Sequence, residues 1–239
     1  MEKEIIEKIK ENPGKILLTT DVHGDKENLI KAMKIGKEKG AKIAFDLGDT
    51  ELGQKIYDKI ARDIGLEGGI ILETFYDHIL NGEKDIKEIS KLFINNGTIL
   101  PVHYVIYNDK FEKYVISEGS RELSEDIMER NYNKNDLEKI IERSRLEPFL
   151  IIKGDDHKAY IGKVKNVEKI FSVKYVPRSE LTDKELKLFE LKDETEINEP
   201  GLYVINPGFI FRDQEVLFSC MVLDCTRKGY FKIEYIPLI

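Results

Sequence analysis

Two short apolar runs, each ending in a cluster of polar residues, constrain the fold of this chain more than any other feature. Ile16-Leu17-Leu18 leads into Asp21-Val22-His23-Gly24-Asp25, and a second run at 41–46 leads into Gly48-Asp49. The segment between them, 26–39, has its apolar residues at helical spacing. A strand, a helix and a second strand in this order predict a right-handed βαβ unit, whose two parallel strands end side by side at one edge of a sheet.

The polar residues at these two strand ends predict a site for a divalent metal ion. Asp21 and His23 alternate along an extended chain, but they can converge on one cation where the strand breaks into a loop, as Gly24 permits. Asp49 brings a second carboxylate from the neighbouring strand. An isolated Asp-x-His would be a turn with a satisfied histidine, and the second strand end favours metal binding instead. We interpret Asp25 as the N-terminal cap of the following helix.

Length, composition and charge narrow the class of protein. The 239 residues, 41% of them hydrophobic, are enough to bury one core, which favours a single domain over 1–239. A net charge of -7 argues against a broad basic surface for duplex nucleic acid. Cys220 and Cys225 occur in a strand-like segment, which predicts packed, reduced thiols. The sequence has no membrane-length apolar run or secretory signal, so we expect a cytoplasmic protein without membrane contact. It gives no indication of oligomeric state.

The rest of the chain divides into further predicted elements. Hydrophobic periodicity predicts additional helices at 2–12, 54–64 and 85–93, with Gly68-Gly69 as a break. Two helical insertions are expected at about 121–146 and 177–200, the second with a charged helix at 183–191 behind a Thr182–Glu185 capping box. The remaining apolar and β-branched runs predict strands, with an antiparallel finish, at 70–72, 98–107, 149–153, 159–164, 169–175, 202–205, 216–224 and 230–236.

Taken in order, the motifs resemble those of the calcineurin-like metallophosphoesterases, in particular the small bacterial and archaeal phosphodiesterase branch. Residues 21–29 resemble the family's Asp-x-His-Gly-Asn-x-x-x-Leu block, and Leu47-Gly48-Asp49 resembles its Gly-Asp block. Ile205-Asn206-Pro207-Gly208 resembles the Asn-Pro-Gly-Ser turn before the closing strands, and Val222-Leu223-Asp224 resembles the strand that follows. The resemblance implies an α/β fold, a four-layer αββα sandwich of two mixed β-sheets flanked by helices.

The same resemblance implies a metal-dependent phosphoesterase and assigns its ligands. It implies that Asp21, His23 and His157 hold one metal and that Asp49 bridges to a second. The catalytic residues that it implies are Asp21, His23, Asp49 and His103, with most of the activity resting on Asp21, His23, Asp49 and His157. Two bridged divalent ions clamp a phosphoryl oxygen and generate a metal-bound hydroxide from water at neutral pH. The expected substrate is a small phosphate ester, either a phosphodiester or a phosphomonoester.

Two departures from the family pattern bear on the second metal. Asp155, in Gly154-Asp155-Asp156-His157, stands where the family has a histidine, and this oxygen donor favours manganese or iron, with zinc and nickel as alternatives. The family's Gly-Asn-x-Asp block has no clean copy. We choose Asn81 as its metal ligand over Asn95-Asn96-Gly97. His103 resembles the histidine of the second metal, although a histidine packed in the sheet is the alternative.

These departures leave a second hypothesis for the function. A chain that lacks the second metal would be a catalytically impaired binding or regulatory protein built on the same fold. The number of bound metal ions and the hydrolysis of a phosphodiester separate the two hypotheses.

Overall fold

A computed structural model describes most of the chain. The described residues are 2–48, 50–71, 97–102, 106–107, 114–115, 134–154, 157–167, 186–210 and 218–238. The helices are α1 (Glu2–Glu11), α2 (Lys26–Glu38), α3 (Gln54–Ile64) and α7 (Lys134–Leu146). The strands are β1 (Lys15–Thr19), β2 (Ile43–Asp46), β3 (Gly68–Ile71), β4 (Ile99–Val102), β5 (Ile106–Tyr107), β6 (Tyr114–Val115), β7 (Pro148–Lys153), β8 (Tyr160–Val164), β9 (Leu186–Leu188), β10 (Thr195–Ile197), β11 (Gly201–Asn206), β12 (Phe218–Arg227) and β13 (Tyr230–Leu238).

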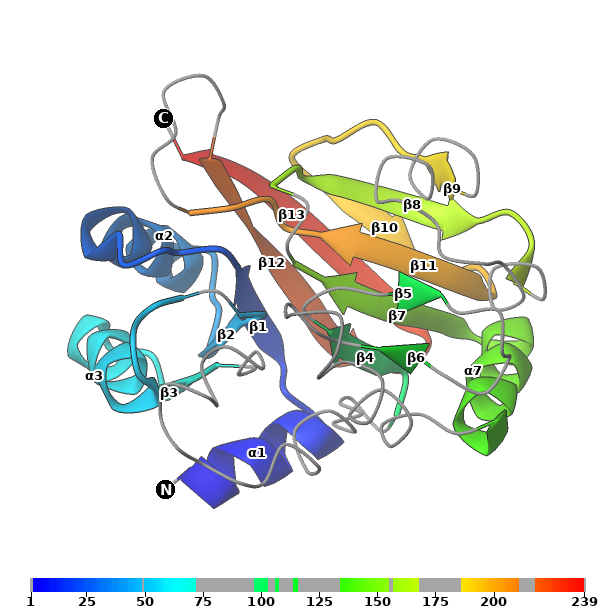
Figure 1. Ribbon diagram of the computed structural model, residues 1–239, viewed down its shortest axis with the longest axis horizontal. Coiled ribbons are helices and arrows are strands. Elements are labelled where there is room, and N and C mark those ends of the chain that lie inside the picture. Colours follow the sequence, from blue (N-terminus) through cyan, green and yellow to red (C-terminus); the bar gives the residue numbers. More distant parts are fainter. Residues whose placement is uncertain are drawn as a thin grey trace, which may run out of the picture.

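Most of the strands form two mixed sheets (Figure 1). The first sheet has the order β10-β13-β12-β1-β2-β3. The pairs β1–β2 and β2–β3 are parallel, and the other neighbouring strands pair in antiparallel fashion. The second has the order β4-β7-β11-β8-β9, in which β4, β7 and β11 are parallel. β5 and β6 pair separately. The predicted βαβ start and antiparallel finish are confirmed.

Strand alternation separates the core into two layers. Ile16 and Leu18 of β1 face the core between the sheets, together with Leu150 and Ile152 of β7. Leu17 faces the other way, into the core beneath α2 and α3. On the second sheet, α7 packs against β7 and β11, so that helices lie on both outer sides (Figure 1). The expected four-layer αββα sandwich is therefore confirmed.

The residues after β1 fold as the sequence predicts. Asp25 caps α2, and its carboxylate accepts hydrogen bonds from the backbone N–H of Asn28 (3.1 Å) and from its side-chain amide (2.9 Å). Gly24 has φ of 75°, in the left-handed region that the sharp turn requires. The chain therefore leaves β1 and enters α2 within a few residues, and this short connection is where the candidate site is built.

The glycine pair at 68–69 was wrongly predicted as a break, because both residues lie inside β3. Gly69 is needed there by packing: a Cβ at this position would lie 2.7 Å from the Tyr57 ring. Glycine within a strand here marks the close approach of an aromatic side chain rather than a turn.

The helix predicted at 183–191 is also wrong within the described residues. Leu186–Leu188 forms edge strand β9, paired with β8, and 195–197 forms β10 of the other sheet. Leu186 is buried over Gly162 of β8, where a Cβ would come within 3.0 Å of it. Pairing with a strand distant in sequence has therefore overridden the local helical pattern.

The strand predicted at 98–107 is divided between two sheets. β4 covers 99–102 on the edge of the second sheet, the position that Pro101 favours, and β5 covers 106–107 in the small β5–β6 pair. The elements predicted at 85–93, 121–133 and 169–175, and the capping box at 182–185, lie outside the described residues.

Both cysteines are buried and free, as predicted. Burial raises the pKa of the Cys220 thiol to about 12 and that of Cys225 well above its usual value, so both thiols are protonated at neutral pH. Among the described residues, no helix is long and apolar enough to cross a membrane.

Candidate metal centre

The loops after β1 and β2 are joined by backbone hydrogen bonds at the ends of the strands. Asp21 N–H donates to the carbonyl of Gly48 (3.0 Å), and Gly24 N–H donates to that of Thr50 (2.9 Å). The side chain of Asp21 is fully buried, and its Oδ2 accepts a hydrogen bond from the Thr20 hydroxyl (2.6 Å). The parallel pairing of β1 and β2 thus continues into the loops and holds the Asp21 carboxylate in a fixed place.

A buried hydrogen-bond chain supports this edge of the sheet from behind. The Tyr57 hydroxyl lies 2.8 Å from Thr19 Oγ1, which donates to Asp46 Oδ2 (2.6 Å), and the other oxygen of Asp46 accepts from Gly48 N–H (2.9 Å). Burial, followed by the charge of Asp46, raises the pKa of Tyr57 well above its usual value. Tyr57 is therefore uncharged and is the first donor in this series of hydrogen bonds. Because Tyr57 belongs to α3, that helix fixes the end of β2.

The loop after β7 is held by the asparagine at the end of β11. Asn206 Nδ2 donates to the carbonyl of Gly154 (3.1 Å), and its Oδ1 accepts from Gly208 N–H (2.9 Å). Asn206 is fully buried. One side chain thus ties Gly154, three residues before His157, to the turn that follows β11.

Asp21, His23 and His157 meet where the loops of the two sheets approach each other. His157 Nε2 lies 3.2 Å from Asp21 Oδ1, and the two imidazole rings are 5.8 Å apart in an edge-to-face arrangement. The His23 and His157 side chains are 28% and 45% exposed, whereas Asp21 has no exposed surface. The buried carboxylate thus forms the floor of the site, and the imidazoles form its solvent-facing walls.

The backbone of this site is strained. Among the described residues, the non-glycine residues with positive φ are Asp21 (52°), His23 (45°), Glu51 (55°) and His157 (48°). Each such residue costs of order 1–3 kcal/mol, and such strain persists at places where the surrounding structure holds a functional geometry. All four lie at this site, which points to a functional constraint on its loops.

The donor set fits a divalent transition metal. One carboxylate and two imidazoles each offer a ligand atom, and these atoms lie within 4.8 Å of one another. A cation with bonds of about 2.0–2.2 Å to nitrogen and oxygen separates its ligands by roughly 3–4 Å, so small side-chain adjustments would complete the coordination. Imidazole and carboxylate together suit manganese, iron, nickel or zinc.

Two neighbours of the triad were missed in the sequence. Glu51 Oε1 lies 3.1 Å from His23 Nδ1, and the ring of Phe209 lies 5.6 Å from that of His157. A carboxylate at Nδ1 leaves Nε2 of His23 as the ligand nitrogen and fixes the orientation of the ring. Glu51 and Phe209 each follow one of the recognised motifs by one or two residues. The directions of their side chains, however, depend on left-handed backbone at Glu51 and Gly208, which no sequence pattern indicates.

Replacing Glu51 by alanine is expected to weaken the binding of Mn²⁺ about tenfold, because the imidazole of His23 loses the partner that orients it. Glu51→Gln keeps an acceptor and should lose less. Calorimetric titration with Mn²⁺ measures both variants, with Glu27→Ala, at an exposed position in the first turn of α2, as the control. Equal affinity in the Glu51→Ala and wild-type proteins would contradict this role.

Replacing Gly208 by alanine is expected to destabilise the fold by at least about 2 kcal/mol, or a fall of roughly 4–8 °C in Tm. Gly208 has φ of 101°, and a Cβ there would collide with Ser219 Oγ. Gly53→Ala is the matched control, since Gly53 has φ of -56° and open space around it. Thermal unfolding of the two variants checks the difference, and equal Tm values would refute the explanation.

The other predicted ligands, Asp49, Asn81, His103 and Asp155, lie outside the described residues. Several described residues next to them lie at the metal centre's end of the sheets. Gly48 and Thr50 accept the hydrogen bonds from the 21–24 loop, Val102 pairs with Lys153, and Gly154 is bound by Asn206.

Comparison with known proteins gives matches to solved structures alone. No family model and no curated protein matches the chain. A metallophosphoesterase from Sphaerobacter thermophilus is 13% identical, with a TM-score of 0.43 over 94% of this chain and 88% of that one. An archaeal phosphodiesterase is 14% identical, with a TM-score of 0.37 over 94% and 99% of the two chains. A phosphoesterase from E. coli is 11% identical, with a TM-score of 0.34 over 88% of each chain. All three of these structures are named as phosphoesterases, one of them as a metallophosphoesterase and one as a phosphodiesterase.

Proposed function

We propose that the protein is a metal-dependent phosphoesterase that hydrolyses a phosphodiester or a phosphomonoester at a two-metal site. One observation carries the proposal: Asp21 and His23 and, from a distant part of the sequence, His157 bring their ligand atoms within 4.8 Å of one another at the strand ends. Left-handed backbone at all three residues supports the proposal, because a purely structural cluster would not require the energetic cost of this conformation.

The chain's own residues divide the work of such a site. Asp21, His23 and His157 would hold the first cation, and Asp49 would bridge to a second that is completed by Asn81, His103 and Asp155. When bound, divalent cations polarise a phosphoryl oxygen and lower the pKa of water toward neutrality. Glu51 orients the His23 ring, and Asn206 holds the loop that carries His157. Manganese or iron is the expected metal.

The site is accessible to a substrate from its imidazole side. The imidazoles of His23 and His157 reach solvent, while the carboxylate of Asp21 is shielded beneath them. An anionic ester can thus approach from the imidazole side, provided that bound cations neutralise the carboxylates. With its net charge of -7, the chain itself would repel a phosphate ester.

Metal counting and hydrolysis together test the proposal. The protein should bind two Mn²⁺ ions per chain and hydrolyse bis(p-nitrophenyl) phosphate in their presence, and EDTA should abolish turnover. Asp49→Asn should lose turnover and keep the fold, as judged by circular dichroism. Fewer than two ions together with no hydrolysis would instead favour the binding or regulatory protein.

A further inference from the structure

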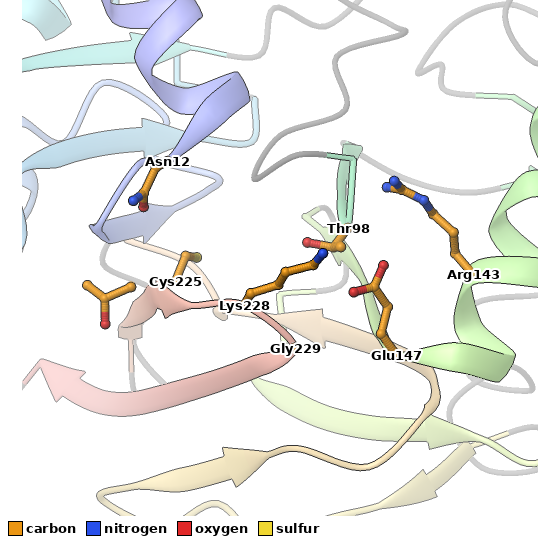
Figure 2. Close-up of a pocket in the computed structure, with 8 residues that line it drawn as sticks. Asn12, Thr98, Arg143, Glu147, Cys225, Lys228 and Gly229 are labelled. Atoms are coloured by element: carbon orange, nitrogen blue, oxygen red, sulfur yellow. The ribbon is translucent and has the colours of Figure 1, made fainter.

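A cavity lies at the end of the sandwich opposite the metal centre. Thr98 and Glu147 directly precede β4 and β7, whose far ends lead to the metal site. The turn between β12 and β13 closes this cavity from the first sheet. The hairpin pocket, as we name it, has a volume of about 240 Å³ and is lined by Asn12, Thr98, Arg143, Glu147, Thr226 and Lys228 (Figure 2).

Charged groups from separate elements meet in the hairpin pocket. Arg143 and Glu147 come from the end of α7 and the residue just after it, whereas Lys228 comes from the β12–β13 turn and extends toward Thr98 and Glu147 (Figure 2). Thr98 itself is almost fully buried. Two cations and one carboxylate give the lining a net positive charge, although the whole chain carries -7. An anion would therefore find a locally favourable potential in this pocket.

The backbone is shaped so that these groups converge. The pairing of β12 with β13 shifts register between Asp224 and Arg227, and such irregularities redirect side chains at the edges of sheets. Gly229, with φ of 67°, then closes the turn beside Lys228. On the other side of the pocket, a Cβ at Gly97 would lie 2.5 Å from Arg143 Nη1. The guanidinium thus packs against the backbone at a position where only glycine leaves enough space.

The pocket has room for more than a single ion. A cavity of about 150 Å³ can hold benzene, so a volume of about 240 Å³ has room for a small organic molecule. Polar groups that converge on a cavity of this kind are typical of small-molecule sites. Glu147 adds an acceptor, which selects for a ligand with hydrogen-bond donors as well as a negative charge.

We propose that the hairpin pocket binds a small organic anion whose phosphate or carboxylate lies between Arg143 and Lys228 and whose hydroxyl or amino group donates to Glu147. Arginine and lysine both bind such anions through charge-assisted hydrogen bonds. The proposal is independent of the phosphoesterase function, because no residue is shared with the metal centre.

Calorimetric titration of the EDTA-treated, full-length protein tests this proposal with three probes: glycerol 3-phosphate, L-glutamate and inorganic phosphate. We expect saturable binding of glycerol 3-phosphate or of L-glutamate. Binding of the first indicates a phosphate ligand, and binding of the second indicates a carboxylate ligand. Inorganic phosphate, which fills less of the cavity, should bind more weakly. Arg143→Gln and Lys228→Gln should each weaken binding at least about tenfold. Arg145→Gln, an exposed position on the same helix, should leave it unchanged.

His157→Ala separates this site from the metal centre, since it should leave binding of the probe intact. Three results would each overturn the proposal. These are no saturable binding of any probe up to about 10 mM, binding unchanged in both the Arg143 and Lys228 variants, or binding lost in His157→Ala. Thermal unfolding of each variant confirms that it is folded, and metal counting reports separately on the phosphoesterase proposal.

Discussion

Asp21→Asn is expected to lower the affinity for Mn²⁺ by more than 100-fold and to abolish phosphoester hydrolysis, while the fold stays intact. The buried Oδ1 of Asp21 lies 3.2 Å from His157 Nε2, at the floor of the site. An amide has the same shape but no charge, so the site loses the only carboxylate of the described triad. Mutating a residue that only orients a metal ligand typically lowers metal affinity 10–100-fold, so the loss of a ligand itself should lower it further.

Asp25→Asn is the matched control for this variant. Asp25 lies on the same loop, but its carboxylate caps α2, and asparagine is an equally good cap. Its metal affinity and turnover should stay within about twofold of the wild-type values. Titration with Mn²⁺ and hydrolysis of bis(p-nitrophenyl) phosphate measure both variants. If Asp21→Asn kept wild-type affinity, the proposed centre would be abandoned.

Asn206→Ala is expected to have the largest effect on stability, about 2–5 kcal/mol, because it leaves two buried backbone groups without their partner. These are the carbonyl of Gly154 and the N–H of Gly208. The loop that carries His157 would lose its anchor, so the affinity for Mn²⁺ should fall as well. Thermal unfolding, at about 2–4 °C for each kcal/mol, together with metal titration checks both effects.

Asn206→Asp removes only one of the two hydrogen bonds. It keeps the acceptor for Gly208 N–H, but its carboxylate would face the carbonyl of Gly154 at a fully buried position. The losses of stability and of metal affinity should therefore be comparable to those of alanine. Asn28→Ala, which removes a hydrogen bond at the partly exposed cap of α2, is the control. Metal affinity unchanged in Asn206→Asp would mean that the bond to Gly154 does not position His157.

Features set by neighbouring residues could be predicted from the sequence. The helix cap at Asp25 and the βαβ start depend on local spacing, and the parallel strands then bring Asp21 next to Gly48. Whether His157 joins them depends on the packing of one sheet on the other. The structure places it beside Asp21, and a metal role for any of these residues stays a proposal.

Other features depend on contacts that no local pattern records. β9 forms because Leu186 fills the space above Gly162, and Gly69 stays in β3 because Tyr57 covers it. The contact between Glu51 and His23 needs left-handed backbone at both residues. The hairpin pocket combines residues from near both ends of the chain, so its existence follows only from the tertiary structure.

The two sheets carry different parts of the triad, and this makes the inter-sheet core a spacer for the site. Asp21 and His23 follow β1 in one sheet, while His157 follows β7 in the other, and Leu18 and Ile152 belong to the layer between them. Such sheets lie about 10 Å apart, a distance set by the side chains that interdigitate. A bulkier or smaller residue in that layer would widen or narrow the gap between carboxylate and imidazole. Metal selectivity would then be tunable from positions that never touch the ion.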